Sequence, residues 1–147
     1  MSPAIRGRAL GIDLGERRIG VALSDSRGVL ALPLCTIERG GNLAGVQEKI
    51  RALAGDNEVA VVVVGLPLSL DGGRGPAAVE ALEFVEVLSS QLDPIGIKVV
   101  TQDERFTTVE ANRALASAGK RSRARRSSVD RSAAAVLLQA WLERSDV

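Results

Sequence analysis

The chain contains no histidine, and this absence excludes several common kinds of catalytic site. Without an imidazole side chain there can be no Ser–His–Asp triad, no histidine proton shuttle and no zinc site with histidine ligands. The single cysteine, Cys35, can form neither an internal disulfide nor a thiolate metal cage. Acid–base or metal chemistry must therefore use carboxylates, Lys, Arg, hydroxyl groups or the backbone, and carboxylates favour hard cations such as Mg²⁺ or Mn²⁺.

Aromatic residues and long apolar runs are scarce as well. The three aromatic residues among 147, Phe84, Phe106 and Trp141, are too few for a stacking platform along single-stranded nucleic acid. No apolar run approaches the roughly 20 residues that a membrane span needs, and the first residues lack the pattern of a signal peptide. One cysteine suits a reducing compartment, and we expect Cys35 to be a small apolar residue at the end of a strand. The sequence thus predicts a cytoplasmic protein with one domain over residues 1–147 and no membrane segment.

Positive charge is concentrated near the carboxyl end, although the formal net charge is only +1. Between residues 113 and 131 the chain has seven Lys or Arg residues and one acid, Asp130. The densest stretch is GKRSRARRSS, residues 119–128. Such a stretch can bind a polyanion or can be a solvated loop, and composition alone does not separate the two. If it binds nucleic acid, contacts to phosphates should dominate, because aromatic residues are few.

The apolar periodicity predicts an alternating order of strands and helices. Three short strands joined by tight turns indicate an antiparallel meander, and a β-branched run further on indicates a strand buried on both faces. The expected strands are 8–15, 18–25, 29–37, 58–67 and 95–104, and the expected helices are 43–54, 76–91, 107–119 and a last one capped by Ser127 or Ser128. The order β-β-β-α-β-α-β-α predicts an α/β fold, a mixed five-stranded sheet with helices on both faces.

Three acidic residues are candidates for one cleft in such a sheet. Asp13 lies in the first strand among small residues, Glu104 ends the fifth strand, and Asp130 lies in the first turn of the last helix. Functional groups gather beyond the carboxyl ends of parallel strands, so these acids are expected to meet. Each also has a structural explanation: an Asx turn for Asp13, an ion pair with Arg105 for Glu104, and a favourable helix dipole for Asp130. Together they form a histidine-free carboxylate cluster, which is what two-metal phosphodiester cleavage requires.

Four motifs carry a family resemblance along nearly the whole chain. They are GIDLGERRIGVALSD (11–25), VVGLPLSLDG (63–72), DERFTTVEA (103–111) and VDRSAAAVLLQAWL (129–142). With these motifs the chain resembles the YqgF/RuvX family, which has a ribonuclease H-like fold related to the RuvC resolvases. The resemblance implies a nuclease that processes the 5′ end of precursor 16S ribosomal RNA, in a family first described as Holliday junction resolvases.

The resemblance also implies roles for individual residues. The family's catalytic and metal-binding acids fall on Asp13, Glu104 and Asp130, which would hold Mg²⁺ or Mn²⁺. RuvC-type enzymes carry an acid at the end of the central strand, where this chain has the turn Gly65–Pro67, so Glu104 would have to substitute for it. The expected contacts to the nucleic-acid backbone are Arg18, Arg105, Lys120, Arg121, Arg123, Arg125, Arg126 and Arg131, and Arg105 could equally be a structural residue.

Three functions stay open on the sequence. The first is a metal-dependent nuclease acting on structured precursor RNA, with ribosomal particles as partners. The second is a Holliday junction resolvase acting on branched DNA, which needs a two-fold dimer with paired sites. The sequence shows no evident dimer surface, so we expect a monomer or a weak homodimer. The third is a ribosome-assembly factor that binds RNA without catalysis and whose acids are structural.

Overall fold

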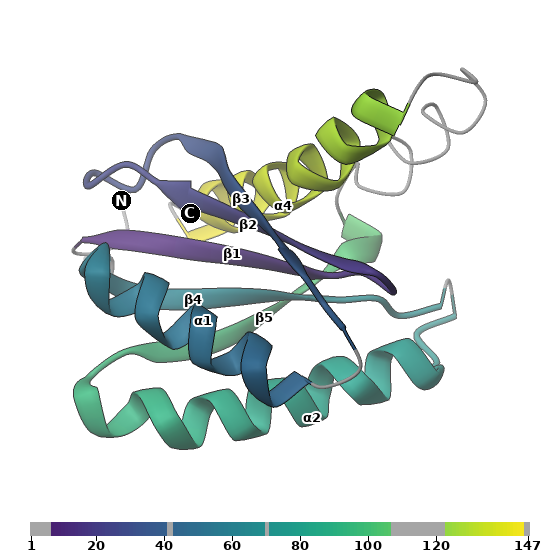
Figure 1. Cartoon of the computed structure of the whole chain (residues 1–147), viewed down its shortest axis with the longest axis horizontal. Coiled ribbons are helices and arrows are strands. Elements are labelled where there is room, and N and C mark those ends of the chain that lie inside the picture. Colours follow the sequence, from purple (N-terminus) through teal and green to yellow (C-terminus); the bar gives the residue numbers. More distant parts are fainter. Residues whose placement is uncertain (1–6, 41–42, 70, 107–122, 146–147) are drawn as a thin grey trace.

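The structure is a computed structural model that describes residues 7–40, 43–69, 71–106 and 123–145, and within the last helix it describes the side chains of residues 133–144. Five strands form one sheet in the order β3-β2-β1-β4-β5 (Figure 1). The strands are β1 (Arg8–Leu14), β2 (Arg18–Ser24), β3 (Ala31–Glu38), β4 (Val59–Leu66) and β5 (Lys98–Asp103). The first three are an antiparallel meander, and β4 and β5 run parallel to β1. The predicted mixed sheet is confirmed.

Helices cover both faces of this sheet. Among the described residues they are α1 (Leu43–Asp56), α2 (Pro76–Leu92) and α4 (Arg123–Ser145), with short 3₁₀ segments η1 (Asp93–Ile95) and η2 (Glu104–Phe106). In Figure 1, α1 and α2 lie in front of the sheet and α4 lies behind it. Pro76 begins α2 as expected, since the first helical turn needs no N–H donor. None of the described helices is both long and apolar enough to cross a bilayer.

The strand periodicity divides the core into two layers. Leu10 and Ile12 of β1 pack in the layer beneath α1 and α2, whereas Ala9 packs in the layer beneath α4. In β4, Val62 and Val63 are both fully buried, one in each layer. This confirms that the β-branched run is a strand covered on both faces.

The sheet and α4 approach each other closely at Gly11 of β1. A Cβ atom built on Gly11 would lie 2.8 Å from Leu138 Cβ and 3.2 Å from the Ala134 carbonyl oxygen. The missing side chain therefore lets the helix backbone lie almost directly on the strand. Ala134 and Leu138 pack against β1 where Gly11 has no side chain, and both residues are fully buried.

This contact changes the helix face that we expected to be buried. The apolar pattern predicts a stripe of Val129, Ala133, Val136, Leu137, Ala140 and Trp141. In the structure the buried side chains among those described are Ala133, Ala134, Leu137, Leu138 and Leu142. The helix is thus rotated by about one residue relative to the prediction, and Val136 and Trp141 are only half-buried.

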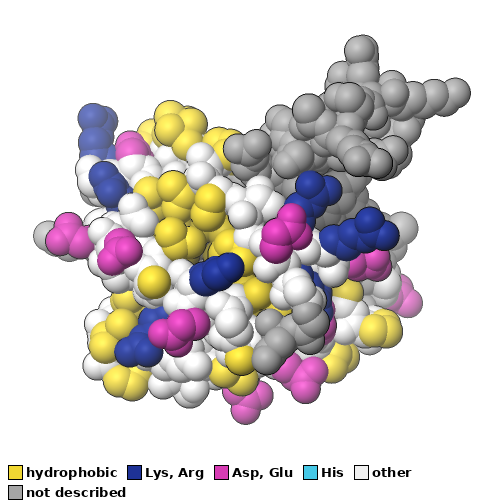
Figure 2. Space-filling model, in the orientation of Figure 1, with side chains coloured by type: hydrophobic (Ala, Val, Ile, Leu, Met, Phe, Trp, Pro, Cys, Tyr) yellow, Lys and Arg dark blue, Asp and Glu magenta, His cyan; other side chains and the backbone are white. Residues whose placement is uncertain are grey.

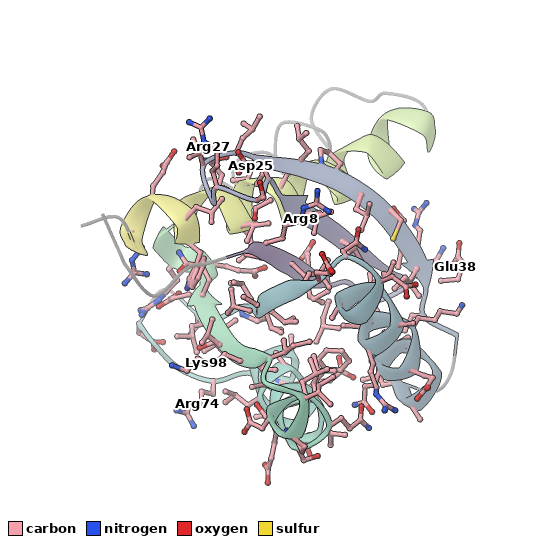
Figure 3. The ribbon with its side chains drawn as sticks, turned by 90° about the vertical axis from the view of Figure 1, so that its left-hand side faces the viewer. Arg8, Asp25, Arg27, Glu38, Arg74 and Lys98 are labelled. Atoms are coloured by element: carbon pink, nitrogen blue, oxygen red, sulfur yellow. The ribbon has the colours of Figure 1, made fainter. Side chains whose placement is uncertain are left out.

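Two strands begin more than one residue later than predicted, for local reasons. The third strand begins at Ala31 and not at 29, because the Asp25 carboxylate accepts hydrogen bonds from the N–H groups of Val29 and Leu30 in the β2–β3 turn. Figure 3 shows Asp25 in this turn, at the end of the sheet away from Glu38. The fifth strand begins at Lys98 and not at 95, because η1 prolongs α2 and Gly96 follows with φ +82°.

The start of the last helix is a further correction. The helix begins at Arg123, so Ser127 and Ser128 lie inside it and do not cap it. Residues 123–128 are therefore helical and are not part of a basic loop, and Asp130 lies in the second turn and not the first. A basic sequence does not reveal this, because Arg and Lys are good helix formers as well as common loop residues. The helix expected over 107–119 lies outside the described residues.

We expect Gly11→Ala to destabilise the protein by about 1–3 kcal/mol, because the new methyl group must displace α4 from β1. The matched control is Gly45→Ala in α1, where a built Cβ meets nothing within 4 Å. That substitution should stabilise the protein by up to about 1 kcal/mol, since alanine is the better helix former. Urea unfolding of both variants measures the difference, and equal effects would contradict the close crossing.

Candidate active site

A pocket of about 400 Å³ opens at the carboxyl ends of β1 and β4. Asp13 of β1, Gly65 of β4 and Glu104 of η2 line its floor. Its rim is formed by the turn between β1 and β2, residues 15–18, and by Ala77 at the start of α2. The structure therefore brings Asp13, Glu104 and Arg18, three of the predicted site residues, to one pocket.

Asp13 is a buried carboxylate on the α4 side of the sheet. It lies opposite Gly20 in the β1–β2 pairing and is only 4% exposed. Strand alternation puts it on the same face as Ala9 and Gly11, as the sequence predicts. The room for a ligand beside Asp13 is the pocket that it lines, because Leu138 and Ala134 occupy the space at Gly11. Burial of the carboxylate is favourable only with compensating charge or hydrogen bonds.

Glu104 enters the pocket through a gap that only glycine provides. Glu104 directly follows β5, at the start of η2 and not within the strand as predicted, and it is 4% exposed. A Cβ built on Gly65 would lie 2.7 Å from Glu104 Oε1 and 3.0 Å from Leu137 Cδ2. The glycine of β4 thus leaves the space that the Glu104 carboxylate, directly after β5, occupies. This is a physical reason why glycine, and not an acid, stands at position 65.

The two residues that flank Glu104, Asp103 and Arg105, form an ion pair with each other. Asp103 accepts hydrogen bonds from Arg105 Nη2 at 2.6 Å and from the Arg105 backbone N–H at 2.9 Å. The side-chain hydrogen bonds, followed by the backbone one, hold the pKa of Asp103 below its ordinary value, and the same pairing raises the pKa of Arg105. A Cβ built on Gly72 would lie 3.4 Å from Arg105 Nη1, so the guanidinium also lies against the glycine loop. Of the two roles left open for Arg105, the described contacts favour the structural one.

Arg39 supports the site from outside the pocket, and the sequence analysis did not single it out. Its Nη1 donates to the Gly15 carbonyl oxygen at 3.0 Å, and its backbone N–H donates to the Arg17 carbonyl oxygen at 3.0 Å. Its Nη2 forms an ion pair with Glu80 of α2. Arg39 therefore ties the turn at one side of the pocket to the helix at the other. The sequence alone does not predict this link between the turn and α2, because a single arginine after a strand is a common surface feature.

The turn itself is tightly constrained. The Gly15 N–H donates to the Arg18 carbonyl oxygen at 3.1 Å, and a Cβ built on Gly15 would lie 2.4 Å from that oxygen. Glycine is therefore required for the turn that carries Arg17 and Arg18 along the pocket rim. On the face shown in Figure 2, basic and acidic side chains of the described residues are interspersed, so the arginine rim is a local feature.

The remaining predicted residues are placed only in part. Asp130, Arg131, Arg123, Arg125 and Arg126 are positions of α4 whose side chains lie outside the described set, and Lys120 and Arg121 lie outside the described residues altogether. Among the side chains that are described, no three His, Cys, Asp or Glu gather to hold a metal ion. Asp13 and Glu104 are therefore a pair of candidate oxygen ligands on the described part of the chain.

We expect Asp103→Asn to lower the thermal midpoint by a few degrees at neutral pH, because the charge-assisted bonds to Arg105 are lost. The folded-state pKa of Asp103 is lowered, so its stabilisation is complete above pH about 4 and disappears as the pH falls through the folded-state pKa. The difference from the parent protein should therefore shrink in acid. Asp56→Asn, at the exposed end of α1, is the control. A pH-independent difference for Asp103→Asn would contradict the assignment.

Solved structures resemble this fold over nearly its full length. The chain aligns with Thermus thermophilus RuvC in complex with a Holliday junction substrate, with a TM-score of 0.59 and 16% identity over 95% of each chain. It also aligns with the yeast mitochondrial Holliday junction resolvase Ydc2, with a TM-score of 0.59 and 13% identity, over 99% of this chain and 82% of that one. At these identities the likeness shows the fold, which is the ribonuclease H-like fold of RuvC.

Sequence comparisons add the family. A protein of Streptomyces coelicolor is 42% identical over 142 residues, covering 97% of this chain and 83% of its own length. A protein of Mycobacteroides abscessus is 42% identical over 139 residues, covering 95% of this chain and 82% of its own. Both bear the name "Putative pre-16S rRNA nuclease". The family model described as "RuvX: Holliday junction resolvase" matches residues 7–144, and the chain therefore belongs to the RuvX family.

Proposed function

We propose that this protein is a divalent-metal-dependent nuclease that cleaves structured RNA at the 5′ end of precursor 16S ribosomal RNA. The observation that carries the proposal is the pair of buried carboxylates, Asp13 and Glu104, on the floor of one pocket with an arginine rim. The relatives' shared name supports the substrate. We further propose that the protein works in the cytoplasm on ribosomal particles, as a monomer or a weak homodimer.

The chemistry of the carboxylate pair fits a hard cation. Two acids buried in one pocket repel each other unless a positive charge or a proton compensates them. Carboxylate oxygens are the ligands that Mg²⁺ and Mn²⁺ prefer. Gly65 adds no side chain beside the Glu104 carboxylate. The described residues therefore suit such an ion with two of its protein ligands.

We infer that Asp130 is the third acid, from its place on α4. Asp130 stands one helical turn before Ala134, which lies against Gly11, and Asp13 is two strand residues beyond Gly11. One turn rises about 5.4 Å and two strand residues about 6.6 Å, so the two displacements nearly match. In Figure 1, α4 runs opposite to β1, with its amino-terminal half toward the carboxyl end of that strand. Asp130 is thereby a neighbour of Asp13 in the proposed site.

The proposed division of labour follows from these positions. A bound divalent ion would supply Lewis-acid stabilisation of the phosphate and an activated water. Asp13, Glu104 and Asp130 would hold it. Arg17 and Arg18 line the same pocket, and α2 begins there with the positive end of its dipole, so both can orient a phosphate group. The basic residues from Lys120 to Arg131 would bind the RNA backbone beyond the pocket, with a strong dependence on salt.

A second candidate activity is the resolution of four-way DNA junctions. The description of the family model and the RuvC fold favour it. This activity needs two symmetric cuts, and therefore a two-fold dimer with paired sites. Substrate preference and oligomeric state together separate it from the RNA nuclease, because the latter needs a single site.

We expect Asp13→Asn and Glu104→Gln each to reduce metal-dependent cleavage by at least about a hundredfold, since each removes the charge of a direct ligand. The assay offers a precursor 16S 5′-end RNA and a mobile four-way DNA junction side by side, with Mg²⁺, Mn²⁺ or EDTA. Glu48→Gln, on exposed α1, is the matched control and should cleave like the parent protein. Loss of cutting in EDTA and in both site variants supports the proposal.

The other outcomes are equally informative. A preference for the junction would replace the RNA substrate with branched DNA. If neither substrate is cut but the parent protein and Asp13→Asn bind the RNA equally, the acids are structural and the protein is a binding factor. Circular dichroism of each variant separates loss of function from loss of fold.

We also expect Gly65→Ala to reduce cleavage by at least about tenfold, because the methyl group would lie where Glu104 Oε1 now approaches. Gly55→Ala in α1 is the control, since a Cβ built there meets nothing within 4 Å. Thermal unfolding and cleavage are measured on both proteins. Full activity in a folded Gly65→Ala protein would show that the Glu104 carboxylate does not need this position.

A further inference from the structure

A second pocket, of about 220 Å³, lies between α4 and the edge strand β5. Thr101 and Gln102 of β5 and Trp141 and Arg144 of α4 line it. Helix α4 packs mainly over β1, β2 and β3, so its far side borders the groove above β5. None of these four residues has a role in the proposed catalytic site, although Trp141 lies within the family motif at residues 129–142.

Gln102 is the unusual member of this group. It is only 2% exposed, and its Oε1 accepts a hydrogen bond from Arg144 Nη1 at 3.3 Å. Its Nε2 is shielded from water and has no acceptor among the described residues. A buried amide donor without an acceptor is unfavourable, and buried polar groups of this kind are often completed by a ligand or a water.

Three of these residues together have the chemistry that binds a nucleobase. Trp141 is half-buried and has an aromatic surface on which a base can stack. The Gln102 amide can hydrogen-bond to a base edge, as Gln does with adenine. Arg144 is an exposed cation that suits a phosphate. The Thr101 side chain is on the opposite face of β5, because it alternates with Val100 and Gln102.

The pocket lies next to the proposed catalytic site. Val100 packs in the core layer beneath α4, so Gln102, two strand residues further on, lies on the same side of the sheet. Gln102 pairs with Gly65, and Glu104 Oε1 lies beside Gly65 on the side that faces Leu137 of α4. We propose that this pocket binds one unpaired base of the RNA substrate, close to the phosphate that is cleaved. The inference rests on the proposed function for the identity of the ligand as RNA.

Binding of the base completes the hydrogen bonding of Gln102. After a small shift of the side chain the base supplies the acceptor that Nε2 lacks, while Oε1 keeps its hydrogen bond from Arg144 Nη1. The base stacks on Trp141, and Arg144 contacts the adjoining phosphate. The pocket therefore selects single-stranded over paired nucleotides, because a paired base cannot leave its stack without cost.

The fluorescence of Trp141 can report the binding of a base in this pocket. Trp141 is the only tryptophan and there is no tyrosine, so the intrinsic fluorescence arises almost wholly at the pocket. The probe is a short single-stranded RNA, added to the full chain in EDTA so that no cleavage occurs. A chain of the same length with abasic residues is the comparison. We expect saturable quenching by the RNA and little quenching by the abasic chain.

Two variants test the assigned contacts. Gln102→Met removes the amide at similar volume, and Arg144→Ala removes an exposed cation, so both should fold. Each should weaken the RNA affinity by at least about tenfold. Arg51→Ala, on α1 at the other face of the sheet, removes the same charge and should bind like the parent protein.

Several results would overturn the proposal. Equal quenching by the abasic chain would show an anion site without base recognition. Equal losses of RNA affinity in Arg144→Ala and Arg51→Ala would show that the RNA is bound by nonspecific electrostatic attraction and not at this pocket. This test of base binding is independent of the proposed nuclease function, because the fluorescence quenching is measured without a metal and also in the Asp13→Asn variant. Saturable quenching by a protein that cuts neither substrate would leave the pocket in place and reject the nuclease.

Discussion

The contact between α4 and β1 at Gly11 is the constraint on which the rest of the structure depends. It brings the helix backbone to within van der Waals distance of the central strand, and it fixes which helix face is buried. Through Leu137, the same helix also closes the space beside Gly65, where the Glu104 carboxylate lies. Two glycines on neighbouring strands thus position these groups: Gly11 lies beneath the helix, and Gly65 lies beside the acid on the pocket floor.

The acids are supported by groups that do not themselves face the pocket. Asp103 and Arg105 pair across Glu104, and they fix the turn that directs this residue away from the strand. Arg39 fixes the opposite turn through two backbone carbonyl groups. A charged site of this kind depends on rigid surroundings, because buried carboxylates would otherwise relax toward water. The structural arginines thus matter as much as those that can contact a phosphate.

Much of the fold could be predicted from the sequence, and the reasons are local. Alternation in β1 and the β-branched run of β4 placed these strands correctly, because side-chain periodicity and burial are directly readable. The rotation of α4 was not predictable, since it depends on the absence of a side chain on a strand more than 100 residues away. The start of α4 was misplaced because Ser127 and Ser128 look like caps, although the helix already begins at Arg123. Of the site, the sequence pointed to Asp13 and Glu104, but Arg39 and Gln102 matter only through contacts that distant segments create.

Arg39 has a further consequence for how this pocket can vary. Its guanidinium serves two acceptors of different kinds, the Glu80 carboxylate and the Gly15 carbonyl oxygen. In an ordinary ion pair the acidic and the basic residue can be swapped between the two positions, and the two side chains still attract each other. Here an acid at position 39 and an arginine at position 80 would restore the attraction but leave the Gly15 carbonyl without its donor. The two positions are therefore not interchangeable. Position 39 must keep a side chain that can donate two hydrogen bonds, and position 80 must keep an acceptor.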